Sequence, residues 1–247
     1  MAETIRIDLP DGAAEAHLSE PDGLSAGGVL FHMDAFGLRP RIAEMVDEIA
    51  SWGHTVLAPN VFHRDGDITT LAPTEDLRVP EHRATYFTGA RRRIDHLTPA
   101  RFAADLPGYV AALRSRTDGP VAAIGYCMGA RLAVRAAGQF PYDVVAVGGF
   151  HGGGLVTSAT DSPHRVIPGT RAEYLFLHAD GDRSMTPETV ADLEQVLTDA
   201  GVAHVNEIVP GAPHGYTMSD TAAWRPEAYQ RHLVALRDLL DRTLRAG

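Results

Sequence analysis

The chain has 247 residues and a formal net charge of −10, and all 22 of its basic residues are arginine. The acidic balance argues against nucleic acid or an anionic membrane as a general partner, and the lack of lysine excludes Schiff-base chemistry on a lysine. The single cysteine cannot form an internal disulfide, no signal peptide is visible, and no uncharged apolar stretch approaches the roughly 18 residues that span a bilayer. We therefore expect a cytoplasmic protein that binds neither nucleic acid nor membrane.

Short apolar runs alternate with segments of helical periodicity along the chain. The expected strands are residues 5–9, 14–19, 29–32, 55–58, 121–124, 144–147, 174–177 and 204–209. The expected helices are residues 42–52, 98–116, 130–137, 187–200 and 225–244. This alternation predicts an α/β fold with a mostly parallel central sheet and helices on both faces. With no linker or internal repeat, we expect one domain over residues 1–247.

The stretch from about residue 60 to residue 98 departs from this alternation. It is polar and contains Asp65-Gly66-Asp67 and the arginine run Arg91-Arg92-Arg93. We interpret it as an excursion on the surface near the strand ends, where insertions of this length often form part of a binding site.

The segment Gly125-Tyr126-Cys127-Met128-Gly129 lies between an expected strand and an expected helix. Its glycines permit a sharp turn that holds the central residue in a strained backbone with its side chain exposed. This pattern is typical of the nucleophile elbow of α/β-hydrolases, with cysteine where serine usually stands. The elbow also predicts two backbone N–H donors for a developing oxyanion, one from Met128 and one from Ala35 in the loop after strand 29–32.

A candidate acid and a candidate histidine follow Cys127 in the chain order of α/β-hydrolases, and each lies after an expected strand. The histidine is His214. The acid is Asp180 or Asp182, and the residues alone do not separate the two, because an Asp-Gly pair is also ordinary turn chemistry. A helix N-terminus and an imidazolium both stabilise a thiolate, the histidine carries the proton, and the carboxylate orients the histidine.

Other interpretations of these residues stay open. A lone cysteine is most often a small buried apolar residue, and most of the other 11 histidines are expected to be solvated or merely hydrogen-bonded. A non-catalytic binding or sensor module on the same fold, a broader carboxylesterase and a peptidase are the alternative functions. The sequence has no metal-binding histidine spacing, no second cysteine and no dinucleotide-binding glycine pattern, so we expect no metal and no cofactor.

The chain resembles the dienelactone hydrolase family of α/β-hydrolases. The matching segments are Phe36-Gly37-Leu38, Ala50-Ser51-Trp52-Gly53-His54, Leu57-Ala58-Pro59-Asn60 through His63-Arg64, Gly125-Tyr126-Cys127-Met128-Gly129, Phe150-His151-Gly152-Gly153 and His214-Gly215-Tyr216. The resemblance implies a triad of Cys127, His214 and Asp182, the acid being Asp182 because the family's acid precedes a short segment that ends in proline. The family has a glutamate before the Phe-Gly loop that contacts the thiol and helps to activate it. Asp34 stands there, one methylene shorter, and either acts in the same way through a shifted backbone or a water, or the activation step differs and Asp34 is a turn or helix-capping residue.

The resemblance further implies hydrolysis of a small lactone or carboxylic ester through a thioester. An arginine that holds the substrate carboxylate in dienelactone-cleaving members is missing from the loop after His214. Arg83 or the run Arg91-Arg92-Arg93 is a candidate substitute; otherwise the substrate is a neutral lactone or ester. His32, beside the loop of Ala35, is as well explained by a structural role. The sequence does not indicate the oligomeric state. The expected substrate contacts are Phe36, Tyr126 and His151.

Overall fold

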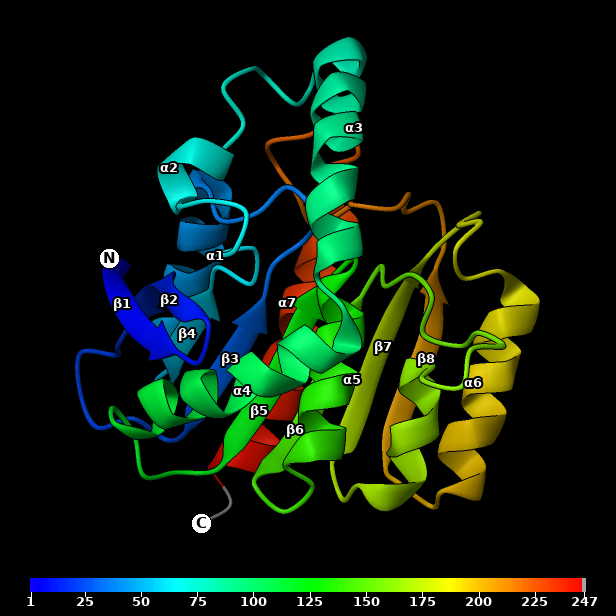
Figure 1. The fold of residues 1–247 in the computed structure, drawn as a ribbon. Helices are drawn as coiled ribbons and strands as arrows, with labels where there is room; N and C mark the ends of the chain where they lie inside the picture. Colours follow the sequence, from blue (N-terminus) through cyan, green and yellow to red (C-terminus); the bar gives the residue numbers. More distant parts are fainter. Residues whose placement is uncertain (246–247) are drawn as a thin grey trace.

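The computed structural model describes residues 1–245. Its eight strands form one sheet in the order β1-β2-β4-β3-β5-β6-β7-β8 (Figure 1). The strands are β1 (Glu3–Leu9), β2 (Gly12–Ser19), β3 (Gly28–His32), β4 (Thr55–Pro59), β5 (Val121–Tyr126), β6 (Val144–Phe150), β7 (Glu173–Ala179) and β8 (His204–Val209). β2 pairs antiparallel with β1 and β4, and all other neighbours are parallel, so the predicted mostly parallel sheet is confirmed.

Helices cover both faces of this sheet. They are α1 (Pro40–Ala50), α2 (Ile68–Leu71), α3 (Pro80–His96), α4 (Pro99–Arg114), α5 (Gly129–Gln139), α6 (Pro187–Asp199) and α7 (Pro226–Leu244). α1 and α7 pack on one face, while α4, α5 and α6 pack on the other together with a short 3-10 helix, Pro163–Gly169, that the sequence analysis did not predict. The predicted α/β-hydrolase architecture is therefore confirmed.

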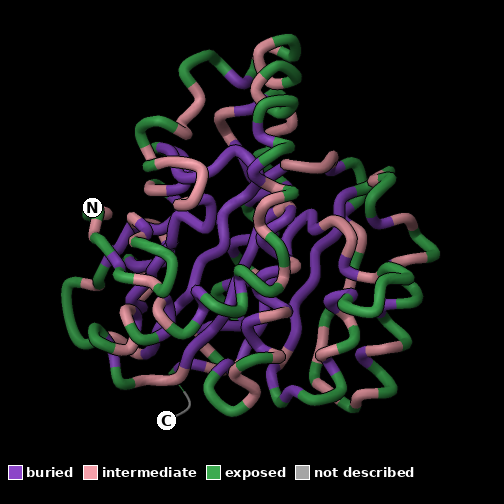
Figure 2. Tube along the Cα trace, in the orientation of Figure 1, coloured by how far each residue is buried: buried purple, intermediate pink, exposed green. Residues whose placement is uncertain are grey.

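The central strands carry the core. All residues of β3, β4 and β5 are buried, and these strands are nearly continuous apolar runs, as expected for parallel strands covered on both faces (Figure 2). α1 contributes an amphipathic face whose buried residues recur at helical spacing, namely Ile42, Met45, Val46 and Ile49. No helix within residues 1–245 has both the length and the apolar composition to cross a membrane.

The polar excursion contains a long helix that the sequence analysis did not predict. α3 has 17 residues, yet only Ala90 and Arg93 are buried, so it shows no apolar stripe by which periodicity would reveal it. α3 rises beyond the carboxyl ends of the parallel strands, where the loops of the candidate site lie (Figure 1). The excursion therefore forms a wall above that end of the sheet.

Candidate active site

Cys127 occupies a sharp turn between β5 and α5. Its φ angle of 55° lies in the left-handed region, which residues with a Cβ rarely adopt. A Cβ at Gly125 would lie 2.1 Å from the carbonyl oxygen of Gly129, and a Cβ at Gly129 would lie 2.3 Å from that of His32. Both positions therefore require glycine. The turn has the form of a nucleophile elbow and presents Cys127 to a cavity.

His214 and Asp182 meet in the loops after β8 and β7. His214 Nδ1 lies 2.6 Å from Asp182 Oδ2, and Asp182 Oδ1 accepts hydrogen bonds from the N–H and the hydroxyl of Ser184 at 2.8 and 2.7 Å. Asp180 Oδ2 instead accepts a hydrogen bond from the Gly211 N–H at 2.8 Å. Asp180 thus ties the loop after β8 to the end of β7, while Asp182 orients the imidazole.

The contacts of His214 favour its protonated form. Burial lowers the pKa of His214, but the hydrogen bonds and charges of Asp182 and Cys127 outweigh burial and raise that pKa to about 10. Burial raises the pKa of Asp182, but hydrogen bonds from His214 and Ser184 lower it to about 2. At neutral pH the pair is an imidazolium against a carboxylate.

Two backbone N–H groups beside the turn have no acceptor among the described residues 1–245. They belong to Ala35, in the loop after β3, and to Met128, which directly follows Cys127. Across residues 1–245, neither N–H makes a hydrogen bond within the chain, although Ala35 is only 3% and Met128 only 5% exposed. Buried backbone donors are nearly always paired, so two unpaired donors at the cavity suit a negatively charged oxygen.

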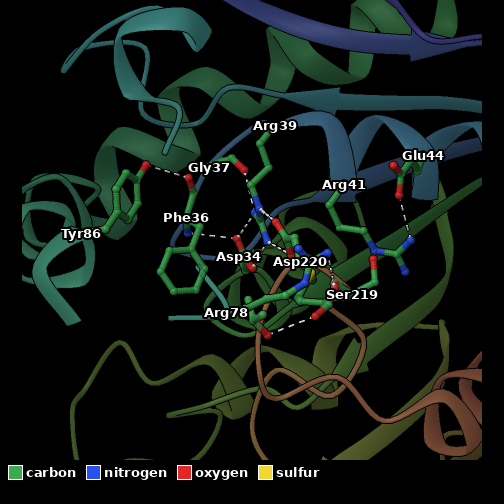
Figure 3. Close-up of polar contacts among 12 residues, drawn as sticks. Asp34, Phe36, Gly37, Arg39, Arg41, Glu44, Arg78, Tyr86, Ser219 and Asp220 are labelled. Carbon is green, nitrogen blue, oxygen red and sulfur yellow. Dashed lines mark hydrogen bonds and ion pairs between the residues drawn. The ribbon is translucent and has the colours of Figure 1, made fainter. Parts of the chain in front are cut away.

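The carboxylate of Asp34 is paired with a buried arginine. Arg39 Nη1 lies 2.7 Å from Asp34 Oδ1 and Arg39 Nη2 lies 3.0 Å from Asp34 Oδ2 (Figure 3). Arg39 also binds Asp220, with Nε 2.5 Å from Oδ2, and Asp34 Oδ1 accepts the Phe36 N–H at 2.9 Å. The resemblance implied a contact between Asp34 and the Cys127 thiol. The hydrogen bonds observed for Asp34 differ from that expectation, and they brace the loop after β3.

A cavity of about 950 Å³ opens over Cys127. This volume lies at the upper end of the range for small-molecule sites. The apolar side chains of its walls include Phe36, Ala84, Phe87, Ile94 and Met218, and its cationic side chains are Arg83, Arg91, Arg131 and Arg183. Arg83 and Arg91 are among the arginines that the sequence analysis singled out. Neither of the next two arginines lines the cavity, since Arg92 is exposed to solvent and Arg93 is buried.

His151 lies against His214 at the base of the cavity. It is fully buried with a φ angle of 39°, its Nε2 lies 2.7 Å from Thr217 Oγ1, and its ring centroid lies 5.2 Å from that of His214. Burial lowers the pKa of His151 well below its usual value, and the charge of His214 acts in the same direction. His151 is therefore a neutral imidazole. Like Phe36, it lines the cavity, as expected of a substrate contact.

Tyr126 and His32 lie in the core. Tyr126 is 0% exposed, its hydroxyl lies 2.8 Å from His232 Nε2, and its ring stacks on Phe31 at 4.9 Å. The predicted substrate contact of Tyr126 is wrong, because the end of β5 directs this side chain toward α7. His32 is equally buried, with its Nδ1 3.0 Å from the carbonyl oxygen of Ile124, in accord with a structural role.

Several residues of the site were not predicted from the sequence. Arg131 lies one helical turn after Cys127, and Arg183 directly follows Asp182. Their closeness in sequence to these two candidate residues could have predicted both arginines as part of the site. Arg39 lies five residues after its partner Asp34, but no regular spacing marks the pair, and its other partner, Asp220, lies far away in sequence. Within the described residues 1–245, no group of three or more His, Cys, Asp or Glu side chains has an arrangement that could hold a metal ion.

A sheet of this order, with a glycine-flanked cysteine after β5, an acid after β7 and a histidine after β8, defines an α/β-hydrolase. The model of the dienelactone hydrolase family matches residues 14–244, and the chain belongs to that family. A carboxymethylenebutenolidase from a Pseudomonas species is 30% identical over 253 residues, which cover 98% of this chain and 96% of the relative.

Two solved structures share the fold. A dienelactone hydrolase from Anabaena variabilis superposes with a TM-score of 0.69 at 18% identity, covering 99% of each chain. A dienelactone hydrolase-like promiscuous phosphotriesterase from metagenomic libraries superposes with a TM-score of 0.70 at 21% identity, covering 98% of each chain. At these identities the likeness concerns the fold. Membership of the family makes this chain a hydrolase of the ester and lactone class.

Proposed function

We propose that this protein is a cysteine-dependent hydrolase that cleaves a small lactone or carboxylic ester through a thioester on Cys127. The observation that supports this most strongly is the 2.6 Å contact between His214 Nδ1 and Asp182 Oδ2, beside a cysteine held at a φ angle of 55°. His214 hydrogen-bonds to Asp182 and lines the same cavity as Cys127, whose proximity helps to raise the pKa of His214. This chain of contacts suits proton transfer to and from a nucleophile.

The reaction begins with attack of the Cys127 sulfur on the carbonyl carbon. The C=O electron pair moves onto the oxygen, which the N–H groups of Ala35 and Met128 hold. The ester C–O bond then breaks, the alcohol oxygen takes a proton from His214 Nε2, and a thioester remains. Water next gives a proton to His214 as its oxygen attacks the thioester carbon, the C–S bond breaks, and the acid leaves. Asp182 fixes the ring of His214 throughout.

The surrounding residues act on the loops and on the substrate. Asp34 is proposed to influence the thiol through the loop after β3, since its carboxylate oxygens already bind Arg39 and the Phe36 N–H. Phe36 and His151 flank the cavity at Cys127 and are the proposed substrate contacts. His151 stays neutral, so it adds no second positive charge beside the protonated His214.

The size of the cavity favours a broader carboxylesterase as the second candidate function. A cavity of about 950 Å³ admits esters well beyond a small lactone. Arg83 and Arg91 at its wall suit a substrate with an anionic group, whereas the apolar side chains suit a neutral one. Rates on dienelactone, neutral lactones, aryl esters of increasing acyl length and amide reporters separate these classes. A peptidase would cleave the amides.

The proposal is tested by steady-state hydrolysis of an aryl acetate by the wild type and by Cys127→Ala. We expect turnover by the wild type and its loss in Cys127→Ala. Arg237→Ala, at a residue that does not line the cavity, is the control variant and is expected to keep wild-type turnover. Full activity of Cys127→Ala would show that another group is the nucleophile. An inactive wild type whose thiol also fails to react with iodoacetamide would favour the non-catalytic binding or sensor module.

A further inference from the structure

Arg93 of α3 is a buried arginine with no acidic partner. Its side chain donates from Nη2 to the carbonyl oxygen of Ala35 at 3.1 Å and to the Tyr86 hydroxyl at 2.6 Å, and from Nη1 to the carbonyl oxygen of Leu71 at 3.4 Å. Its guanidinium also lies 5.1 Å from the ring centroid of Phe62. Arg93 is only 7% exposed, and within residues 1–245 no carboxylate lies within ion-pair distance of it. Burial of an uncompensated charge is unfavourable, so the position calls for a functional explanation.

One backbone acceptor of Arg93, the carbonyl oxygen of Ala35, belongs to the loop whose Ala35 N–H makes no hydrogen bond within residues 1–245. The peptide between Ala35 and Phe36 is held at both ends, because Arg93 binds its carbonyl oxygen and Asp34 Oδ1 accepts its N–H at 2.9 Å. The Ala35 N–H belongs to the preceding peptide, so holding the Ala35–Phe36 peptide limits the directions of that N–H by restricting the backbone rotations at Ala35. That N–H is one of the two free donors at the cavity.

Tyr86 extends the same support to the next peptide. Its hydroxyl lies 2.9 Å from the carbonyl oxygen of Phe36, next to a further contact with the carbonyl oxygen of Leu71, and its ring packs on that of Phe36 with centroids 5.6 Å apart (Figure 3). A hydroxyl proton serves one acceptor at a time, and the Arg93 donor to Tyr86 leaves that proton for the two carbonyl groups.

We propose that Arg93 is a positioning residue for the oxyanion hole. From α3 it holds the Ala35 carbonyl so that the Ala35 N–H stays aimed at the substrate oxygen. Only Ala90 and Arg93 anchor α3 by burial, and the same helix lines the cavity with Arg83 and Phe87. The wall that contacts the substrate is therefore fastened to the oxyanion loop. This inference rests on the proposed function, since it presumes an ester oxyanion at this hole.

Two reactions of the Cys127 sulfur distinguish a positioning role of Arg93 from a general disturbance of the site. Ester hydrolysis forms an oxyanion, whereas alkylation by iodoacetamide does not, because the sulfur displaces iodide from a CH₂ carbon. For Arg93→Met we expect kcat on an aryl acetate to fall on the order of tenfold, with KM and the alkylation rate each changed less than about twofold. Arg92→Met, on the exposed side of the same helix, is the matched control and is expected to equal the wild type in both reactions.

A second pair of variants keeps the proposal testable if Arg93→Met does not fold. Tyr86→Phe removes one hydroxyl from the same network, and Tyr142→Phe removes one from an exposed tyrosine that is 76% accessible. Tyr86→Phe is expected to lower kcat several-fold without slowing alkylation, and Tyr142→Phe to change neither. Arg93→Lys keeps the charge but lacks the two terminal nitrogens of the guanidinium, so its kcat is expected to stay low.

Three results would overturn the positioning role. They are full recovery of kcat in Arg93→Lys, an equal fall of hydrolysis and alkylation in the variants of Arg93 and Tyr86, or unchanged hydrolysis in both. Failure of the proposed function looks different, because Cys127→Ala would then hydrolyse the ester at the wild-type rate. The two ideas can therefore fail separately.

Discussion

Replacement of Asp182 by asparagine is expected to disable the site by reversing the hydrogen bond to His214. Asp182 accepts two hydrogen bonds from Ser184 on Oδ1 and one from His214 on Oδ2. An amide with its oxygen toward Ser184 presents its NH₂ to His214 Nδ1, so that nitrogen must give up its proton. The proton then occupies Nε2, the atom that has to accept one from water. In the opposite orientation the NH₂ of the asparagine faces the Ser184 N–H, so that two hydrogen-bond donors oppose each other.

The expected fall in kcat of Asp182→Asn follows from the roles of the His214 ring. The same change in a serine triad lowers kcat about 10⁴-fold through the wrong tautomer, and a thiol needs less help to ionise than a hydroxyl, so we expect a fall of about 10³-fold here. Asp180→Asn is the matched control. An asparagine at position 180 still accepts the Gly211 N–H through its amide oxygen, so kcat is expected to stay within about threefold of the wild type.

The assay is kcat and KM on an aryl acetate for both variants, with kcat/KM followed against pH. Loss of the Asp182 charge removes a group that raises the pKa of His214 to about 10, so the basic limb of the profile is expected to move to lower pH in Asp182→Asn. Equal effects of the two substitutions, or a larger effect of Asp180→Asn, would refute the assignment of Asp182 as the acid.

Three further predictions concern stability. Gly129→Ala is expected to abolish the soluble folded protein, seen as lost expression yield, because its Cβ would lie 2.3 Å from a backbone oxygen. Arg39→Met leaves the buried Asp34 carboxylate unpaired and is expected to lower the free energy of unfolding, measured in urea, by about 3–5 kcal/mol; an unchanged midpoint would contradict this. Folding lowers the pKa of Asp182 from 3.8 to about 2, so its pairing stabilises the protein by about 2 kcal/mol above pH 3.8 and is lost as the pH falls toward 2. Folding raises the pKa of His214 from 6.5 to about 10, so its contribution is complete below pH 6.5 and is lost as the pH rises through 10. Melting temperatures of the wild type and Asp182→Asn across pH check both limbs, and identical pH dependence in the two proteins would argue against them.

Local chemistry made the sheet and the elbow predictable. The buried strands are short apolar runs bounded by glycine, proline or polar residues. Glycine is required at 125 and 129 because a Cβ there would lie only 2.1 and 2.3 Å from a backbone oxygen. α3 was not predictable from periodicity, because most of its residues are exposed and one of its two buried side chains is an arginine. That helix is stabilised by hydrogen bonds to the loop after β3 instead of by an apolar stripe.

The finer details of the site depended on contacts between distant segments. The residues of the turn alone left Asp180 and Asp182 equivalent, and only the path of the loop after β8 brings His214 to Asp182 and Gly211 to Asp180. The pairing of Asp34 with Arg39 spans only five residues, yet it was not predictable either, because an acid before a Phe-Gly turn gives no sign of which base it binds. Sequence patterns identify such side chains as candidates, whereas tertiary packing selects their partners.

The most direct test of the proposed mechanism is the mass of the protein quenched in acid during turnover of an aryl acetate. The mechanism predicts a species heavier by one acetyl group, mapped to the peptide that contains Cys127, formed and consumed at rates that account for kcat, and missing from Cys127→Ala. An acetyl group on another residue, or turnover by Cys127→Ala at the wild-type rate, would contradict the thioester mechanism.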